Sequence, residues 1–145
     1  MTKSPSQHLR GVIKDLWFVL APPTVVLVLH ILRQLIWPLW IELDMLAHLL
    51  GGLTIAWAAG NFYLVLRRRR ALSALPRAFY VYYLLSAVAL IGVLWEIQEW
   101  IVFHTIVTLP PGITDVWTDT ISDLTLDLFG GLIWFLIDSR RGKKS

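Results

Sequence analysis

Four long apolar segments alternate with short polar ones along the chain. The apolar segments cover about residues 16–37, 43–66, 79–103 and 117–137, and a polar tail of about residues 1–15 precedes the first. An α-helix needs about 20 residues to cross the hydrocarbon layer of a membrane, because it rises about 1.5 Å per residue. The pattern therefore predicts an all-α fold, an integral membrane bundle of four transmembrane helices, with all 145 residues in a single domain.

Basic residues are distributed unevenly between the two ends of this predicted bundle. Of the 13 Lys and Arg residues, all except Arg33 lie in the tail, between the second and third spans, or after the fourth span. These three places are on the same side of a four-span protein. Cytoplasmic segments carry an excess of Lys and Arg, so we predict that the N- and C-termini are both cytoplasmic.

The composition agrees with a membrane location. The chain is 57% hydrophobic and only 16% charged, whereas a soluble domain is typically about 25% charged. The run Arg67–Arg70 is expected to contact anionic lipids rather than nucleic acid, because it directly follows a span. The absence of cysteine excludes disulfides and thiolate metal sites.

Acidic side chains are concentrated in the opposite half of the spans. Of the ten Asp and Glu residues, only Asp15 and Asp138 lie toward the predicted cytoplasmic ends. A carboxylate is costly in lipid, so it must face protein, water or a cation. The second and fourth spans run inward and the third runs outward, which brings their polar positions to similar depths. We therefore predict that the following side chains meet near the outer face: Asp44, His48, Glu96, Glu99, Asp119, Asp123 and Asp127.

The spacing of these residues suits a metal ion. Residues three or four positions apart share one face of a helix, and crowded carboxylates need a proton, a basic partner or a metal. Oxygen ligands suit a hard divalent ion, and an imidazole shifts the preference toward zinc or manganese. We predict that a divalent metal (Zn, Mn or Mg) is held by Asp44, His48, Glu96 and Asp123.

The other polar residues at this depth are assigned to a substrate. Glu99 or Asp127 is predicted to act as a general base toward an ion-bound water. His30 and Arg33 lie three positions apart on the first span. They are the predicted substrate-binding residues, and Arg33 is expected to hold an anionic head group.

Structural explanations account equally well for several of these residues. Asp44 and Asp119 stand near helix starts, where an acidic side chain commonly caps the backbone. Arg33 can extend toward the outer interface while its stem stays in lipid. His48 can be a packed histidine with its hydrogen bonds satisfied inside the bundle.

The order of the motifs adds a family likeness. Asp44-x-x-x-His48 with Gly51-Gly52 comes first, then Trp95-Glu96-Ile97-Gln98-Glu99-Trp100, then Asp119-Thr120, Asp123 to Asp127, and Gly130-Gly131. Over about residues 40–138 this order resembles the VanZ-like superfamily, with the closest likeness to its YjdF-type bacterial inner membrane proteins. The resemblance implies a small multi-pass protein of the bacterial cytoplasmic membrane.

At two positions this chain has an acidic residue where the VanZ-like pattern has an amide residue. VanZ relatives usually have Glu-x-x-Gln where this chain has Glu96 and Glu99, and Asn where it has Asp127. These departures argue against the teicoplanin-resistance role of VanZ itself.

Taken together, the sequence predicts a membrane protein with an acidic, metal-binding site near the outer face. This site would bind or act on a lipid or envelope-precursor head group, and an enzyme of this kind would be a metal-dependent hydrolase or transferase on a lipid-type substrate. Ion or proton translocation is one alternative, although the inner halves of the last three spans lack acidic, basic or histidine residues until the terminal charges. A non-catalytic accessory membrane subunit is the other.

Overall fold

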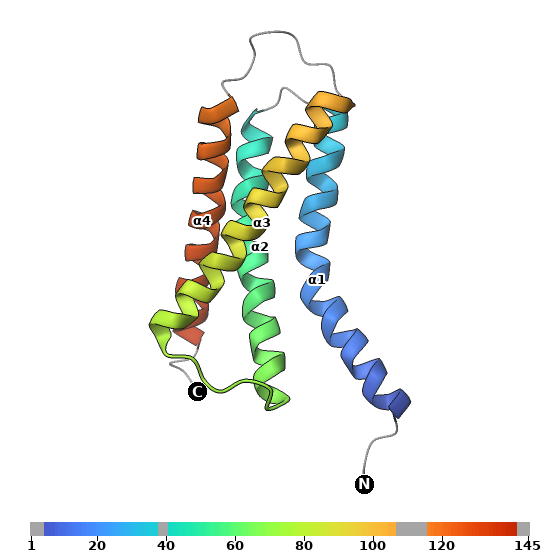
Figure 1. Cartoon of the computed structure of the whole chain (residues 1–145), viewed down its shortest axis with the longest axis vertical. Coiled ribbons are helices and arrows are strands. Elements are labelled where there is room, and N and C mark those ends of the chain that lie inside the picture. The colour runs from blue at the N-terminus through green and yellow to red at the C-terminus, as the bar shows by residue number, and fades with distance from the viewer. Residues whose placement is uncertain (1–4, 38–40, 107–115, 142–145) are drawn as a thin grey trace.

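The computed structural model describes residues 5–37, 41–106 and 116–141. All the regular structure in these residues is helical: α1 (Pro5–Ile36), α2 (Ile41–Arg68), α3 (Arg77–Thr105) and α4 (Val116–Arg141), as Figure 1 shows. Each of the four helices is long and apolar enough to cross a membrane. The predicted all-α fold with four membrane-spanning helices is confirmed.

Local sequence signals explain where the helices bend and stop. Figure 1 shows that α1 bends in its N-terminal half, and Pro22 and Pro23 lie inside this helix, where proline removes backbone donors. At the end of α2, Ala71 N donates to Leu66 O over 2.9 Å, and Arg70 adopts a positive φ of 56°. This is the Schellman arrangement, in which a left-handed residue ends a helix.

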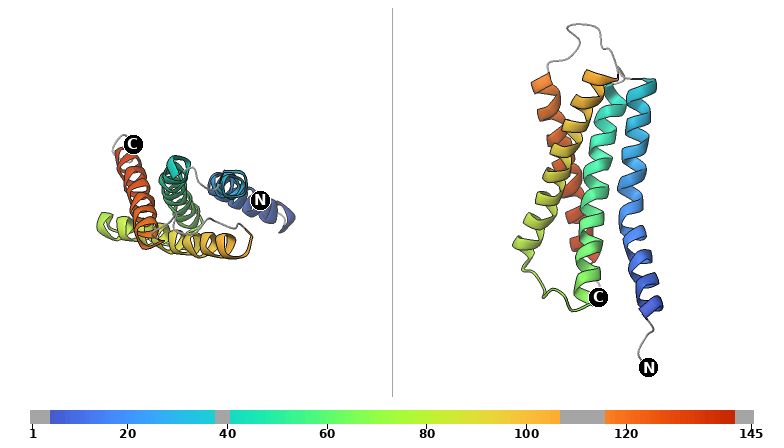
Figure 2. Two further views of the ribbon diagram at one scale, coloured as in Figure 1. Left: turned by 90° about the horizontal axis from the view of Figure 1, so that it is seen from above. Right: turned by 45° about the vertical axis from the view of Figure 1, so that its right-hand side comes forward.

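Helix α2 is the centre of the bundle. It packs against α1 on one side and α4 on the other, and α3 lies across α2 and α4 (Figure 2). Among the described residues, the backbone of α1 approaches that of α2 alone. The polar contacts between α1 and α3 described below are therefore made by side chains that extend across a gap.

Glycines bring α2 and α4 into backbone contact. A Cβ atom added at Gly52 would lie 1.9 Å from the backbone oxygen of Asp127, and one added at Gly130 would lie 2.2 Å from the backbone oxygen of Leu49. Small residues at helix crossings allow this close approach in membrane bundles. The contact places His48, one turn before Gly52, opposite the acidic face of α4.

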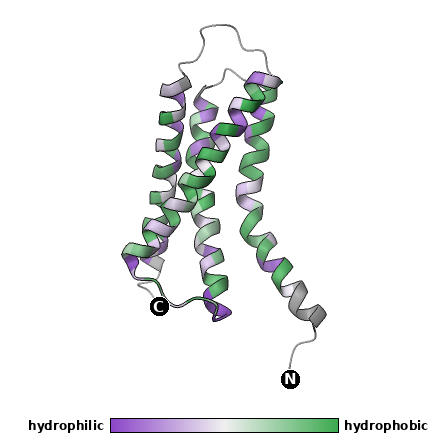
Figure 3. Cartoon of the chain, viewed as in Figure 1, coloured by the Kyte–Doolittle hydropathy of each residue, from purple (hydrophilic) through white to green (hydrophobic). Residues whose placement is uncertain are grey.

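The outside of the bundle is apolar and its interior is divided into two parts. Large apolar side chains such as Trp17 and Leu90 are 76% and 62% exposed, as expected of surfaces that face lipid, and Figure 3 shows the hydrophobic colour along all four helices. An apolar core fills the half near the start of α1 and the end of α4. It is formed by Ile55, Ala56, Leu84, Val88, Trp134 and Phe135.

The start of α1 and the end of α4 lie at the same end of the bundle (Figure 1). Arg67 and Arg68, at the end of α2, are at this end too. That this end faces the cytoplasm stays a prediction. Residues 1–4 of the predicted tail lie outside the described residues, as do residues 38–40, 107–115 and 142–145.

Candidate metal centre

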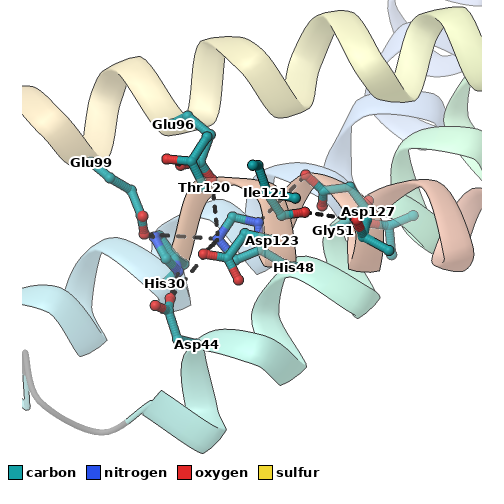
Figure 4. A network of polar contacts seen from close by, with 12 residues as sticks. His30, Asp44, His48, Gly51, Glu96, Glu99, Thr120, Ile121, Asp123 and Asp127 are labelled. Atoms are coloured by element: carbon teal, nitrogen blue, oxygen red, sulfur yellow. Dashed lines mark hydrogen bonds and ion pairs between the residues drawn. The ribbon is translucent and has the colours of Figure 1, made fainter. Parts of the chain in front are cut away.

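Buried and half-buried polar side chains from all four helices meet in the half of the bundle away from the described chain ends. Figure 4 shows most of them gathered around His48. Helix α1 contributes His30, Arg33 and Gln34; α2 contributes Asp44 and His48; α3 contributes Glu96 and Glu99; and α4 contributes Thr120, Asp123 and Asp127.

The His48 ring lies at the centre of this cluster. Its Nε2 atom is 3.8 Å from Asp123 Oδ2, 3.9 Å from Glu96 Oε1 and Glu99 Oε1, and 4.0 Å from Asp44 Oδ1. These distances are too long for hydrogen bonds. The side chain is fully buried, and Nε2 has no hydrogen-bond partner in the described part of the chain.

Two carboxylate oxygens around His48 Nε2 also lack a partner. They are Glu96 Oε1 and Asp123 Oδ2, and Asp123 is only 2% exposed. His48, Glu96, Glu99 and Asp123 each offer one ligand atom within 4.8 Å of the others, and the two unpartnered oxygens lie 3.9 and 3.8 Å from His48 Nε2. An unsatisfied buried polar atom costs about 1–3 kcal/mol. One divalent ion bound between the two oxygens and His48 Nε2 could satisfy all three atoms at once.

The spacing is close to that of a metal site. Ligands of a tetrahedral zinc ion lie about 3.4 Å apart, since each bond is about 2.0–2.1 Å long. The separations of 3.8–3.9 Å around His48 Nε2 exceed this by a few tenths of an ångström. Small side-chain rotations close that difference, so the atoms can hold one divalent cation.

Asp127 contacts the opposite side of the same ring. Its Oδ2 atom lies 3.4 Å from His48 Nδ1, and the side chain is fully buried. A carboxylate at this position favours a proton on Nδ1, the tautomer in which the Nε2 lone pair can bind a metal. Histidines that bind metals are usually oriented by such a second carboxylate.

Helix α1 supplies the partners of Glu99. His30 Nε2 is 2.6 Å from Glu99 Oε1, and Gln34 Nε2 donates a hydrogen bond to the same oxygen over 2.7 Å. Arg33 Nη2 lies 3.6 Å away. Glu99 is therefore the most fully satisfied carboxylate facing His48.

Asp44 is paired with Arg33. Its Oδ1 atom contacts Arg33 Nη2 directly, and His30 Nδ1 lies 3.6 Å from the same oxygen. Arg33 is only 7% exposed, so it turns into the bundle instead of extending to the interface. Asp44 and Asp119 each follow the first residue of their helix by three positions, which places them inside the first turn and not before it, where an N-cap stands.

The structure brings all the predicted site residues into one cluster: His30, Arg33, Asp44, His48, Glu96, Glu99, Asp123 and Asp127. Asp119 also lies at its edge, with a carboxylate oxygen within 4.8 Å of those of Asp44 and Asp123. The individual roles assigned from the sequence stay predictions.

Four contributors were missed by sequence reasoning. Thr120 donates to Glu96 Oε2 over 2.7 Å, and Gln98 donates to Gln34 Oε1 over 3.1 Å. The ring of Trp95 packs against His30 and His48 with centroids 4.7 and 5.3 Å apart. A signal was present for all four, because Gln34, Trp95 and Thr120 each lie one helical turn from a predicted site residue and Gln98 is adjacent to Glu99.

A family model described as "Predicted membrane protein (DUF2238)" matches residues 15–144. No curated protein and no solved structure shows a significant match to the chain. The family match covers the whole polar cluster and all four membrane-spanning segments except residues 11–14 of the first. The chain therefore belongs to the DUF2238 family of predicted membrane proteins.

Proposed function

We propose that this membrane protein binds a divalent cation through His48, Glu96 and Asp123. One observation carries the proposal: three buried atoms, one from each residue, face one another without hydrogen-bond partners in the described structure. Metal coordination satisfies all three and offsets the repulsion between the carboxylates. Three protein ligands leave a coordination position for water or substrate, as in catalytic zinc sites.

The donor set favours zinc or manganese over magnesium. Magnesium prefers oxygen ligands alone and keeps much of its water, whereas an imidazole nitrogen suits zinc and other transition metals. His48 contributes that nitrogen, and Asp127 orients its ring. In this proposal Asp127 supports the ligand, which differs from the base role that its sequence position suggested.

Glu99 is the best-placed general base. It faces His48 Nε2 at 3.9 Å and is held by His30 and Gln34. With a metal bound, Glu99 would be placed to accept a proton from a water on that metal, while the bond from the substrate to its leaving group breaks. The reaction class is hydrolysis or transfer.

The substrate of this proposal is the polar head group of a lipid or envelope precursor. The cluster lies inside the membrane-spanning part of the bundle, where a lipid-borne group is the available reactant. A divalent ion and the Arg33 guanidinium both favour an oxyanion such as a phosphate. The charge bias of the sequence predicts a site toward the outer leaflet of a bacterial cytoplasmic membrane, and the VanZ-like motif order supports an envelope role.

Metal analysis of the detergent-purified protein tests the cation. We expect about one zinc or manganese ion per wild-type chain, and loss of that ion in Glu96→Gln and in Asp123→Asn. The amide variants keep the volume of the side chain while they remove a ligand. Glu42→Gln is the matched control, because Glu42 is exposed at the start of α2 and outside the cluster.

A wild type that takes up no metal after incubation with zinc or manganese would refute the proposal. In that case Glu96→Gln should be neutral or stabilising, because it removes a buried charge. The acids would then share protons and pair with Arg33 and His30, as in a translocating protein or an accessory subunit.

A further inference from the structure

An apolar groove of about 620 Å³ lies between α1, α2 and α3. It begins near Leu16 on α1 and Phe62 on α2 and ends at Trp95 and Gln98 on α3. Leu20 and Leu94, which line it, are 54% and 53% exposed, so the groove opens sideways. Within the described ranges the backbone of α1 packs on α2 and not on α3, so this opening separates α1 from α3.

The groove passes the middle of the bundle. The membrane-spanning part of α1 covers Gly11–Ile36, so its middle is near Pro23. Leu16 lies about 10 Å from that level toward the chain ends, at about 1.5 Å per residue. Half of the hydrocarbon layer is about 15 Å thick. A chain that fills the groove from its Gln98 end therefore extends beyond the midplane.

The upper end of the groove adjoins the candidate metal centre. Trp95 stands between the two, with its ring against His30 and His48. Gln98 donates to Gln34, which in turn donates to Glu99. Trp95 Nε1 and Gln98 Oε1 are buried and have no partner in the described residues. One donor and one acceptor are thus available where the groove meets the polar cluster.

We infer that the groove holds the hydrocarbon chain of the lipid whose head group occupies the metal centre. The bound molecule is a lipid whose hydrocarbon chain runs from the candidate metal centre past the membrane midplane. The polar linkage between its head group and its chain forms hydrogen bonds with Trp95 and Gln98. The lipid enters sideways between α1 and α3. This inference rests on the proposed function, because it identifies the substrate as a membrane lipid that is bound by its chain as well as its head.

Photolabelling in vesicles tests the inference. The protein is reconstituted in phosphatidylcholine vesicles with a trace of phosphatidic acid that carries a diazirine at the end of one acyl chain. In ordinary bilayer lipid of either leaflet, chain ends lie at the midplane. The end of an acyl chain bound in the groove lies beyond the midplane instead. We therefore expect labelling at Leu16, Leu20 and Phe62, and much weaker labelling at the lipid-facing Leu90.

Two tryptophan substitutions on neighbouring residues of α3 supply the comparison. Ile91 lines the groove, whereas Leu90 does not. We expect Ile91→Trp to lower labelling at Leu16 and Leu20 by about tenfold or more, because it fills the groove. Leu90→Trp should leave labelling unchanged. Bound metal should be equal in both variants, which shows that the centre is intact.

Even labelling on all faces of the helices, or equal labelling in both variants, would overturn the inference. A dimeric protein with no labelled lipid at Leu16 and Leu20 would also overturn it, since a second copy would then cover the groove. The outcome is separate from that of the proposed function. Groove labelling with no bound metal refutes the metal centre alone, and bound metal with even labelling refutes the groove alone.

Discussion

The two ring nitrogens of His48 meet carboxylates in different ways. Nδ1 lies 3.4 Å from one oxygen of Asp127, whereas Nε2 faces oxygens of four other acids at 3.8–4.0 Å. The first contact orients the ring, and the second arrangement leaves room for an ion. Asp127 therefore belongs to the support of the site, and its removal should weaken metal binding without removing a ligand.

We predict that Asp127→Asn lowers the metal affinity by about 10–100-fold, the usual effect of losing a carboxylate behind a metal-binding histidine. The measurement is competition against a chromophoric chelator in detergent solution. Asp138→Asn is the control, because Asp138 accepts a hydrogen bond from Tyr80 at the other end of the bundle. Unchanged affinity in Asp127→Asn would show that the Asp127 carboxylate does not support metal binding by His48.

The contact between α2 and α4 sets the geometry of the centre. At Gly52 the backbone of one helix touches the backbone of the other, so no side chain can rotate away to make room. The residues on either side, His48 and Asp127, keep their positions only while the two helices remain this close. The close packing of α2 against α4 at Gly52 therefore determines how His48 and Asp127 are positioned.

We predict that Gly52→Ala separates α2 from α4 and lowers both bound metal and thermal stability in detergent. The added Cβ would lie 1.9 Å from Asp127 O, a distance that requires a backbone shift. Gly11→Ala is the matched control, because a Cβ there meets nothing within 4 Å. That change should be neutral or stabilising by up to about 1 kcal/mol, since alanine favours helix. Equal behaviour of the two variants would contradict the close packing.

The whole molecule is polarised along its long axis. The described cluster of acids lies at one end and the basic residues at the ends of α2 and α4 lie at the other (Figures 1 and 4). The single basic residue among the acids, Arg33, is paired with Asp44. The excess of basic residues at one end predicts the orientation of the chain in the membrane. That orientation in turn predicts which leaflet the candidate centre faces.

We predict that reporter fusions after Arg70 and after Ser145 report the cytoplasm, and that a fusion near Pro111 reports the outside. The reason is the excess of Lys and Arg at one end of the bundle. Alkaline phosphatase and a fluorescent protein are suitable paired reporters, since each is active on one side only. A cytoplasmic signal at Pro111 would reverse the orientation and move the centre to the inner leaflet.

The sequence by itself determined the class of fold. Four apolar segments of membrane length permit only helices in lipid, because each backbone polar group must be satisfied within its own segment. Helical spacing also determined that Asp44 shares a face with His48, and Asp123 with Asp127. Depth along the spans then predicted that these faces meet the acids of α3.

Only the tertiary structure decided which atoms meet. The sequence assigned Asp44 to the metal and Glu99 to the base role, but it did not predict that Asp44 pairs with Arg33 or that His30 and Gln34 hold Glu99. Likewise, the sequence allowed Asp127 to face the candidate ion site, but in the structure it contacts the opposite side of the His48 ring. The partners depend on how each helix is rotated and tilted. In a bundle whose outer surface is as apolar as its core, hydrophobic periodicity does not encode that rotation. It is decided by backbone contacts such as the one at Gly52.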